Sequence, residues 1–323
     1  MDSIQPKVAY TKPMRTRTLV LVGLAAVATT VHASFDLMLI NEGNLVHRVD
    51  PVTRTYLGSF STPFASAMTA SFARKSLYLA TGFGVDVWDY STGEERPGRS
   101  FAVSSIVTSV AVSGDQSTLY VGQFNGTIAK FDAATSASTG TFATVASAQI
   151  QAIHGLPDGR VLALTGTTSG HTLRLYSSTG TQLSSVAVDS SSTAASSVLS
   201  LWTYTGSSDY IFFRGVNTGT SYNYVVLPKG TNSLGTVFGA SSSGISSISG
   251  FEPGHVGGYT IGPDTTPANG VRVTRYSSSG EYLGSSVFSN IASASSTAIV
   301  LAPEPGTWAA LGLGALALMR RRR

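Results

Sequence analysis

The side chains that could carry out acid–base chemistry are few in this sequence and far apart. His154, Asp115 and Glu252 stand near the ends of short apolar segments that are typical of strands. An imidazole and a carboxylate that meet at one site can act as general acid and base, and His154 with Glu252 is the best such pair available. Three scattered groups are too few for a metal cluster. We therefore predict no catalytic, cofactor-binding or metal-binding residue, and no cofactor.

Local motifs of nucleophilic, phosphate-binding and zinc chemistry are also missing. The chain has no cysteine, which excludes disulfides, thiolate catalysis and cysteine-ligated zinc. It contains no G-x-S-x-G elbow, P-loop or H-E-x-x-H sequence. Trp88, Trp202 and Tyr204 could stack on sugar rings, although a place in the hydrophobic core is the preferred interpretation.

The elements that must position these residues are short strands in a repeated unit. Six segments share an apolar or aromatic anchor, a polar turn and a second apolar strand, and their anchors lie 39 to 50 residues apart. This period is typical of a four-stranded propeller blade. The sequence therefore predicts an all-β fold. The anchors are Val49, Trp88, Phe131, Tyr176, Val226 and Tyr276.

The polar turns of the first three units begin with an aspartate in a D-x-x-T pattern. These residues are Asp50, Asp89 and Asp132. An aspartate at this place can accept hydrogen bonds from the backbone N–H groups of the reversing chain, so we predict that the three residues close hairpins. A calcium site is the alternative, but the spacing places one aspartate in each unit.

The innermost strand of each unit is predicted from an apolar run that precedes its hairpins and contains no Asp, Glu or Arg. The first hairpin region, 36–60, lacks such a run, whereas the last run, 296–302, has no strands after it. Pairing these two segments completes a unit and leaves no free sheet edge. We therefore predict a six-bladed β-propeller closed by its N- and C-terminal strands. The inner strands are predicted at 66–72, 106–112, 149–154, 198–204, 245–251 and 296–301.

Two alternatives to this fold remain open. A propeller of seven blades would need roughly 300 residues at this period, more than lie between the two end segments. An irregular pair of β-sandwiches would use the same short strands. The low proportion of charged residues, 12%, together with abundant Ser, Thr and Gly, fits either all-β fold better than a helical bundle.

The basic character of the chain comes from its ends. Residues 1–33 and 303–323 contain eight of the 21 basic residues, and the 13 that remain between them are balanced by 15 acidic residues. A basic isoelectric point near 9.3 therefore describes the end segments rather than the central domain. We predict no nucleic-acid partner, because phosphate binding needs a basic surface.

The N-terminal segment has the three parts of a secretory signal peptide. From Met14 a basic start leads into an apolar stretch that ends in "VHA" before Ser34. The small residue Ala33 and Ser34 flank the predicted cleavage point, which makes residues 1–33 the signal peptide. Translation could begin at Met1 or at Met14.

The C-terminal segment "APEPGTWAALGLGALALMRRRR" combines a short motif, an apolar run and terminal arginines. As a helix, residues 307–319 would be ~20 Å long, shorter than a hydrocarbon core of ~30 Å. Arginines that reach to the interface and local thinning of the bilayer would allow it to span. Arginines retained on the cytoplasmic side would place residues 34–302 outside the inner membrane. The cluster is Arg320, Arg321, Arg322 and Arg323.

This segment resembles the PEP-CTERM sorting signal of Gram-negative bacteria. The resemblance covers about 21 residues and shows all three parts in the same order, with a signal peptide at the other end of the chain. It implies processing by an exosortase, with Pro303, Glu304 and Pro305 marking the processed region. It also implies a connection with bacteria that make extracellular polysaccharide. The stretch "VDPVTRTYLGSF" is similar to YVTN and quinoprotein-like propellers. This similarity identifies no cofactor ligand in the present sequence.

The sequence therefore predicts three parts: a signal peptide at 1–33, a β-propeller at 34–302 and a sorting segment with a transmembrane helix at 303–323. We predict an exported surface or extracellular protein with a non-enzymatic binding or scaffold role, linked to extracellular polysaccharide. The first alternative is a propeller enzyme of the lactonase, lyase or glycosidase type with a site at the channel mouth. The second is a structural component of a biofilm.

Overall fold

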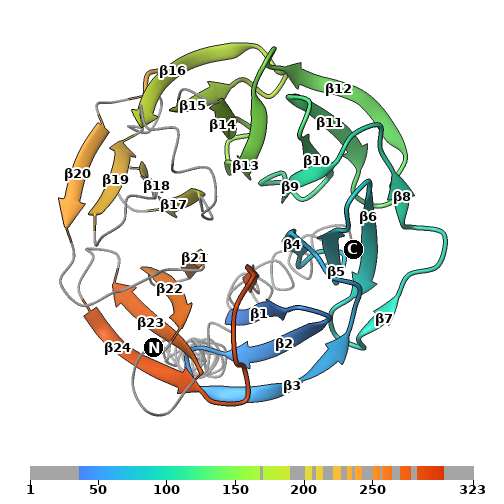
Figure 1. Cartoon of the computed structure of the whole chain (residues 1–323), viewed down its shortest axis with the longest axis vertical. Coiled ribbons are helices and arrows are strands. Elements are labelled where there is room, and N and C mark those ends of the chain that lie inside the picture. Colours follow the sequence, from blue (N-terminus) through green and yellow to red (C-terminus); the bar gives the residue numbers. More distant parts are fainter. Residues whose placement is uncertain are drawn as a thin grey trace, which may run out of the picture. The chain divides into compact units, whose positions relative to one another are not determined.

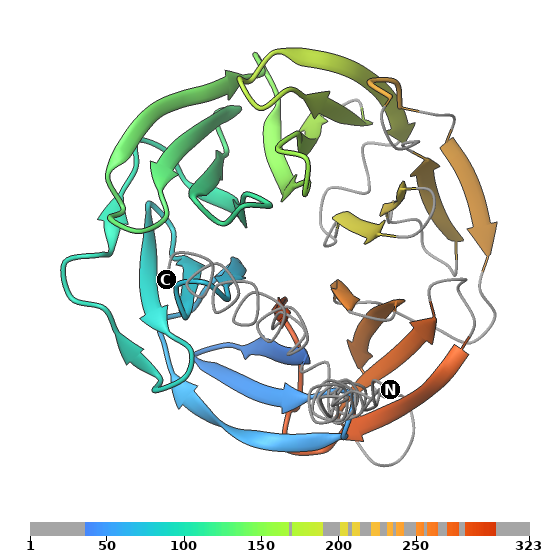
Figure 2. The same cartoon turned by 180° about the vertical axis from the view of Figure 1, so that it is seen from behind.

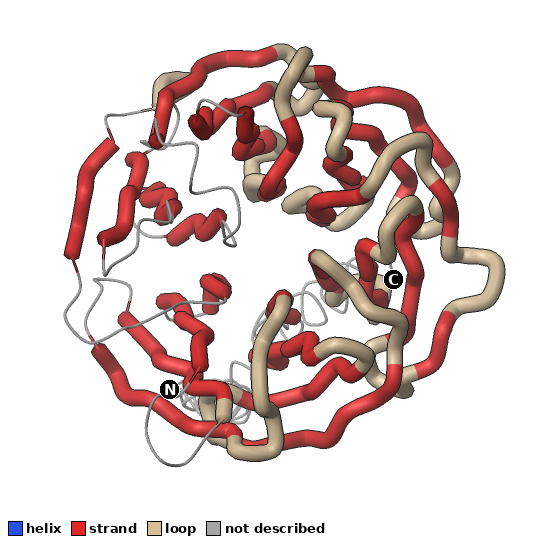
Figure 3. Tube along the Cα trace, viewed as in Figure 1, coloured by secondary structure: helices blue, strands red, loops and turns tan. Residues whose placement is uncertain are grey.

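The computed structural model describes most of the central part of the chain. The described residues are 36–167, 170–189, 201–205, 209–213, 221–226, 231–234, 237–241, 250–254, 257–263, 270–277 and 282–301. They belong to one compact unit, Phe35–Ala302. Their regular elements are all strands, as Figure 3 shows. The predicted signal peptide at 1–33 and sorting segment at 303–323 lie outside the described residues.

The strands form six antiparallel sheets, which the all-β prediction anticipated. From the centre outward, the sheet that contains both ends of the unit has β25 (Ser296–Leu301), β1 (Asp36–Glu42), β2 (Leu45–Asp50) and β3 (Thr55–Ser61). The next sheet has β4 (Ala67–Ser71), β5 (Ser76–Ala80), β6 (Gly84–Asp89) and β7 (Glu94–Glu95), with β8 (Phe101–Ala102) also paired to β6. The third has β9 (Val107–Val112), β10 (Thr118–Gln123), β11 (Thr127–Asp132) and β12 (Ser138–Thr144).

The other three sheets follow the same order. The fourth has β13 (Gln149–Gly155), β14 (Val161–Thr167), β15 (Gly170–Tyr176) and β16 (Gln182–Asp189). The fifth has β17 (Leu201–Thr205), β18 (Asp209–Phe213), β19 (Ser221–Val226) and β20 (Val237–Ser241). The sixth has β21 (Gly250–Gly254), β22 (Gly257–Pro263), β23 (Val271–Ser277) and β24 (Tyr282–Phe288).

Within this unit the six sheets follow one another around a common centre, in a propeller-like arrangement (Figures 1 and 2). Each innermost strand contacts the innermost strand of the next sheet, and the series β4, β9, β13, β17, β21, β25 returns to β4. The predicted pairing of the two ends is confirmed, because β1 and β25 are antiparallel neighbours from Asp36 opposite Leu301 to Asn41 opposite Ser296. One sheet therefore takes strands from both ends of the unit.

Four predicted inner strands coincide with β4, β9, β13 and β25, and two are displaced. The strand β17 begins at Leu201 rather than at 198, and β21 covers Gly250–Gly254 rather than 245–251. The predicted run ended at Phe251, whereas β21 continues through Glu252 and Pro253. An innermost strand is hydrogen-bonded to a neighbour on one side only. Proline has no N–H group to donate, and such a strand tolerates it because one edge forms no ladder bonds. The statement that the inner strands lack acidic residues was therefore wrong at Glu252.

The hydrophobic core lies between neighbouring sheets. The second strand of a sheet is covered on both faces, and every residue of β5 is buried. Leu79 of β5 packs with Leu39 of β1 and Val300 of β25, so one cluster joins the first two sheets. The outermost strand β3 instead alternates between exposed and half-buried residues. Apolar runs at β1 and β5 thus reflect burial on two faces, as in other strands without a solvent face.

The predicted hairpin role of the three aspartates is confirmed. Oδ1 of Asp50 accepts hydrogen bonds from the backbone N–H groups of Val52 and Thr53 at 2.8 and 2.9 Å. Asp132 accepts the equivalent bonds from Ala134 and Thr135 at 2.8 and 2.7 Å. These bonds satisfy donors that the turn would otherwise leave unpaired.

A buried hydrogen bond helps to join the last sheet to the first. The hydroxyl of Tyr259, on β22, donates to Oδ2 of Asp36 at the start of β1 at 2.6 Å. We expect Tyr259→Phe to lower the free energy of unfolding by about 1.5–3 kcal/mol, because a hydrogen bond to a carboxylate is stronger than one between neutral groups. Urea denaturation measures the change.

The matched control for this variant is Tyr78→Phe. The Tyr78 hydroxyl donates to the carbonyl oxygen of Ala133 at 2.7 Å, and a guanidinium nitrogen of Arg99 donates to the same oxygen at 2.9 Å. The carbonyl therefore keeps a donor when the hydroxyl is removed, and we expect a loss of only about 1 kcal/mol. Equal losses in the two variants would contradict a specific contribution of the carboxylate bond.

Candidate functional site

The residues that were considered for acid–base chemistry are distributed over different sheets. His154 is on β13 and Glu252 is on β21, and β17 lies between these two inner strands. Burial lowers the pKa of His154 to about 4, so its imidazole is neutral at pH 7. The side chain of Glu252 lies outside the described part of the structure. The prediction that no residue is catalytic stays a prediction, and nothing in the described geometry brings this pair together.

Asp115 has a structural task in the turn between β9 and β10. Its Oδ1 accepts hydrogen bonds from the Ser113 hydroxyl at 2.6 Å and from the Ser117 backbone N–H at 3.0 Å. These bonds hold the pKa of Asp115 below its ordinary value, because they favour the charged form. Among the described residues, no group of three or more His, Asp or Glu side chains is placed to hold a metal ion.

A hydrogen-bonded histidine that sequence reasoning overlooked lies in the first sheet. His47 Nε2 is 2.9 Å from Glu42 Oε2, and its Nδ1 is 3.2 Å from the Tyr56 hydroxyl. The other carboxylate oxygen of Glu42 accepts the backbone N–H of Ala292 at 3.2 Å. A carboxylate beside an imidazole can orient a catalytic base, but only 3% of His47 is exposed. The network therefore joins β1, β2 and β3 to the segment that leads into β25, and it leaves the imidazole itself almost no contact with solvent.

The turns at one end of the strands carry many of the charged side chains of the described residues. Antiparallel strands reverse direction at each turn, so the turns after β2, β4, β6, β9, β11 and β13 lie on one side of the unit. We call this side the charged turn face. Its acidic and basic side chains are interleaved, so no continuous basic surface forms. They include Asp50, Arg54, Arg74, Lys75, Asp89, Arg96, Asp115, Asp132, Asp158 and Arg160.

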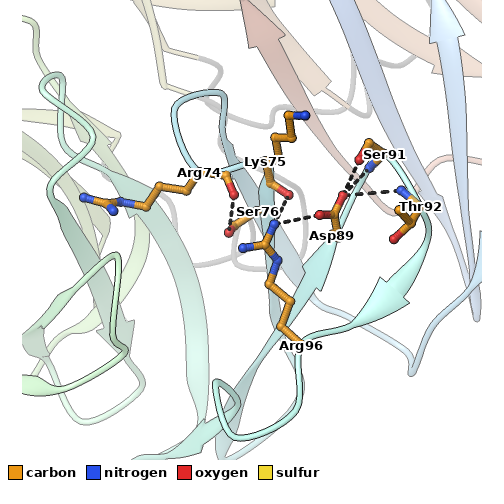
Figure 4. Close-up of polar contacts among 7 residues, drawn as sticks. All are labelled: Arg74, Lys75, Ser76, Asp89, Ser91, Thr92 and Arg96. Carbon is orange, nitrogen blue, oxygen red and sulfur yellow. Dashed lines mark hydrogen bonds and ion pairs between the residues drawn. The ribbon is translucent and has the colours of Figure 1, made fainter.

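Asp89 shows how these charges are used (Figure 4). A guanidinium nitrogen of Arg96 lies 2.7 Å from Asp89 Oδ2 and also donates to the carbonyl of Lys75 at 3.2 Å. Oδ1 of Asp89 accepts the backbone N–H of Ser91 at 2.8 Å. Partial burial raises the pKa of Asp89, but the bonds from Ser91 and Arg96 outweigh it and hold the pKa below its ordinary value. The carboxylate therefore fixes a turn and its neighbour.

The opposite side of the unit has a different chemistry. On this side the described connections from β1 to β13 are 43–44, 62–66, 81–83, 103–106, 124–126 and 145–148, and none of these six contains a charged residue. Large apolar side chains are exposed on five successive segments of this side. We call this group the apolar loop face, and it consists of Leu45, Phe64, Phe83, Ile106 and Phe124.

The exposure of its three phenylalanines is large. Phe64 is 60%, Phe83 is 61% and Phe124 is 50% exposed. Backbone hydrogen bonds hold the loops that carry them: Val103 N–H donates to Phe83 O at 2.8 Å and Phe124 N–H donates to Ile106 O at 2.9 Å, while in the Phe64 loop Ser66 N–H donates to Ala80 O at 3.0 Å. The loops are thus held side by side, and the rings project from a fixed framework. Sequence reasoning missed them, although each ring stands beside a turn residue in "TPFAS", "TGFG" or "QFNG".

The aromatic residues that the sequence did single out have other places. Trp88 packs against the core cluster of the first two sheets, and its ring stacks on Phe60 with centroids 6.2 Å apart. Its preferred interpretation as a core residue is confirmed. Trp202 and Tyr204 are on β17, and their side chains lie outside the described residues.

The targeting residues also lie outside the described residues. These are Ala33 and Ser34 at the predicted cleavage point, and Pro303, Glu304, Pro305 and Arg320 to Arg323 in the sorting segment. Comparison of the sequence with protein families decides what the second group is. Residues 301–323 carry a PEP-CTERM protein-sorting motif. No helix among the described residues is long and apolar enough to cross a membrane.

Comparisons of the whole chain show its fold alone. No curated protein sequence matches the chain. Among solved structures, the hydrazine synthase of Kuenenia stuttgartiensis is similar over 72% of this chain and 70% of that chain, at 15% identity and a TM-score of 0.51. A protein of unknown function from Bacteroides caccae is similar over 83% of this chain and 99% of that chain, at 11% identity and a TM-score of 0.55. The likeness agrees with a β-propeller-like domain ahead of the PEP-CTERM motif.

Proposed function

We propose that this protein is exported through the inner membrane of a Gram-negative bacterium, processed by an exosortase, and displayed at the cell surface or released outside the cell. The match of residues 301–323 to the PEP-CTERM protein-sorting motif carries this proposal. Its exported part is a closed six-bladed β-propeller. The domain acts as a non-enzymatic binding or scaffold protein, and its ligand is extracellular polysaccharide.

The order of events follows from the chemistry of the two ends. The signal peptide directs the chain across the inner membrane, and a signal peptidase then cuts between Ala33 and Ser34. The short apolar helix at 307–319 then stops in the membrane, with Arg320 to Arg323 held on the cytoplasmic side by their charge. The exosortase acts near Pro303, Glu304 and Pro305 and separates the domain from this helix.

Three observations support a binding role over an enzymatic one. His47 and its partner Glu42 are hydrogen-bonded in a network with almost no exposure of the imidazole. His154 is neutral at pH 7 and lies in a different sheet from Glu252. The carboxylates of the charged turn face accept backbone hydrogen bonds within their own turns. Five of the large apolar side chains that are exposed among the described residues lie on successive segments of one side, the apolar loop face.

The sorting step is tested by two variants of the full chain. We expect replacement of Pro303, Glu304 and Pro305 by alanine, and separately deletion of Arg320 to Arg323, to leave an unprocessed form in the membrane fraction. The first variant removes the cleavage signal, and the second removes the charges that hold the helix in place. Cell fractionation and mass spectrometry of the C-terminus measure the outcome. A chain ending at Ala302 is the control, because it has no segment to process. Normal processing of both variants would contradict the proposal.

The binding role is tested on the exported product. We expect it to retain at least one polysaccharide on a glycan array and to show no turnover of that polysaccharide. A stoichiometric divalent ion on inner-strand ligands, together with hydrolysis or lyase activity, would instead support a propeller enzyme. Absence of any retained polysaccharide would support a purely structural role in the matrix.

A further inference from the structure

The apolar loop face is the part of the described surface that is built to contact something other than water. Isolated exposed apolar residues are ordinary, but contiguous groups mark sites of interaction. Leu45, Phe64, Phe83, Ile106 and Phe124 occupy five successive segments across three neighbouring sheets. Other large exposed apolar residues, such as Leu57 on β3 and Tyr282 on β24, are on outermost strands.

We infer that the apolar loop face binds a neutral polysaccharide chain by stacking sugar rings on Phe64, Phe83 and Phe124. This inference rests on the proposed function, because it names the surface and the ligand class of the binding domain. A pyranose ring has a face of C–H groups, which packs favourably on an aromatic ring, and an edge of hydroxyl groups. The surface should therefore present aromatic rings next to uncharged hydrogen-bonding groups.

The described residues around the rings have this composition. Asn44, Ser66, Ser104 and Asn125 are exposed in the same connections as the apolar residues. Asn125 is adjacent to Phe124, and its Oδ1 accepts the backbone N–H of Thr127 at 3.0 Å, which fixes the side chain. Amides and hydroxyls of this kind can exchange hydrogen bonds with sugar hydroxyls without burying a charge.

The distribution of charge selects a neutral chain. The connections 43–44, 62–66, 81–83, 103–106, 124–126 and 145–148 contain no lysine, arginine, aspartate or glutamate. A uronic acid or sulfated polymer would lose hydration at this surface with no cation to compensate it. Basic residues such as Arg54, Arg74 and Arg160 are in turns of the opposite side, the charged turn face. A lipid surface is less well matched, because membrane-binding apolar surfaces are usually accompanied by Lys or Arg.

The surface is also rigid, which lowers the entropic cost of binding. The turn that carries Phe124 contains Gly126, with φ of +84° and no space for a Cβ next to the carbonyl oxygen of Val145. The N–H of Val145 donates to Gly126 O at 2.9 Å, so this turn is fixed to the next loop. Phe83 and Ile106 are held by the backbone bonds to Val103 and Phe124.

The arrangement favours a polymer over a single sugar. The rings stand on loops of neighbouring sheets, and packed sheets lie roughly 10 Å apart. A chain of several sugar residues is needed to reach more than one ring. Each contact is weak, but contacts made by one chain act together, so affinity should rise steeply with chain length.

The test uses Phe83→Ala, Phe124→Ala and the double variant in the full chain, with the exported product purified. The probes are a length series of neutral gluco-oligosaccharides and a neutral glucan, with alginate as the anionic polymer. We expect the wild type to bind the longer neutral chains, with little change between low and high salt. Each single variant should weaken binding by about two- to tenfold, and the double variant by about the product.

The control variant is Tyr282→Ala. Tyr282 is 60% exposed, much like Phe83, but it is on the outermost strand β24. It should bind like the wild type. Thermal unfolding of all four variants should match the wild type closely, because these substitutions remove exposed side chains. Loss of binding in the phenylalanine variants is then a loss of contacts.

The remaining outcomes overturn the inference in distinguishable ways. Salt-sensitive binding of alginate that the phenylalanine variants retain would leave the proposed polysaccharide role intact and move the site to the charged turn face. A dimer that becomes a monomer in the phenylalanine variants would show that a second copy covers the surface. Failure of every neutral probe to bind would overturn this inference, whereas the proposed ligand class is overturned only if the glycan array also retains no polysaccharide.

Discussion

A chain that ends at residue 295 is expected to form no stable monomer, whereas a chain that ends at Ala302 folds normally. The difference between the two is β25, Ser296–Leu301. It is the innermost strand of the sheet whose other strands come from the N-terminal end of the unit. Its loss would remove the hydrogen-bonding partner of β1 along the register from Asp36 to Asn41.

The loss is expected to be large because it acts on both packing and backbone pairing. Ala298 and Val300 are nearly fully buried, and they belong to the cluster that contains Leu37 and Leu39 of β1. Without β25 these leucines would lie on an open edge that can pair with another chain. The combined loss is comparable with the whole stability of a domain, about 5–15 kcal/mol.

The measurement is a comparison of the two truncations by size-exclusion chromatography, far-UV circular dichroism and limited proteolysis. We expect the chain ending at residue 295 to aggregate or to be degraded. The chain ending at Ala302 lacks the whole sorting segment, so it controls for the length of the deletion. A monomeric chain ending at residue 295 with unchanged thermal stability would show that β25 does not close the ring.

The propeller-like order of sheets could be predicted because its signals are local or periodic. Anchors such as Val49 and Trp88 recur at the length of one unit. Asp50 and Asp132 act within their own turns, on N–H groups two and three residues ahead, so a short stretch of sequence contains the whole interaction. Closure by β25 followed from counting strands, because one segment lacked a strand and another had one to spare.

The features that escaped prediction depend on residues that are distant in the sequence or on exposure. The hydrogen bond between Glu42 and Ala292 joins residues 250 positions apart, and no local sequence pattern predicts it. The apolar loop face exists because successive connections return to the same side of the unit. Phe83 and Trp88 look alike as aromatic residues in one strand region, but only the fold places Phe83 outside and Trp88 against the core.

Lowering the pH from 7 to 4 is expected to reduce the free energy of unfolding by up to about 3 kcal/mol through His154 alone. Burial lowers the pKa of this imidazole from 6.5 to about 4. Between these values the unfolded chain binds a proton that the folded chain does not. The contribution of His154 is therefore fully present above about pH 6.5, and it is lost as the pH falls to about 4.

Urea unfolding at a series of pH values measures this loss, with His154→Gln as the test variant. Glutamine does not titrate, so the variant should show a much smaller fall in stability between pH 6.5 and 4. Asp89→Asn is the control, because the pKa of Asp89 is below its ordinary value and its contribution is lost only at lower pH. Burial raises the pKa of Asp86, which favours the folded state as the pH falls, but this carboxyl is present in all the chains compared.

The result also bears on the choice between binding domain and enzyme. An imidazole that stays neutral down to about pH 4 is a poor proton donor at pH 7. If His154→Gln keeps the acid sensitivity of the wild type, the imidazole must be solvated or paired with a carboxylate in the folded state. That result would support an acid–base role for the pair of His154 and Glu252. If the sensitivity disappears, His154 is a half-buried residue of an inner strand that stays neutral in the folded chain.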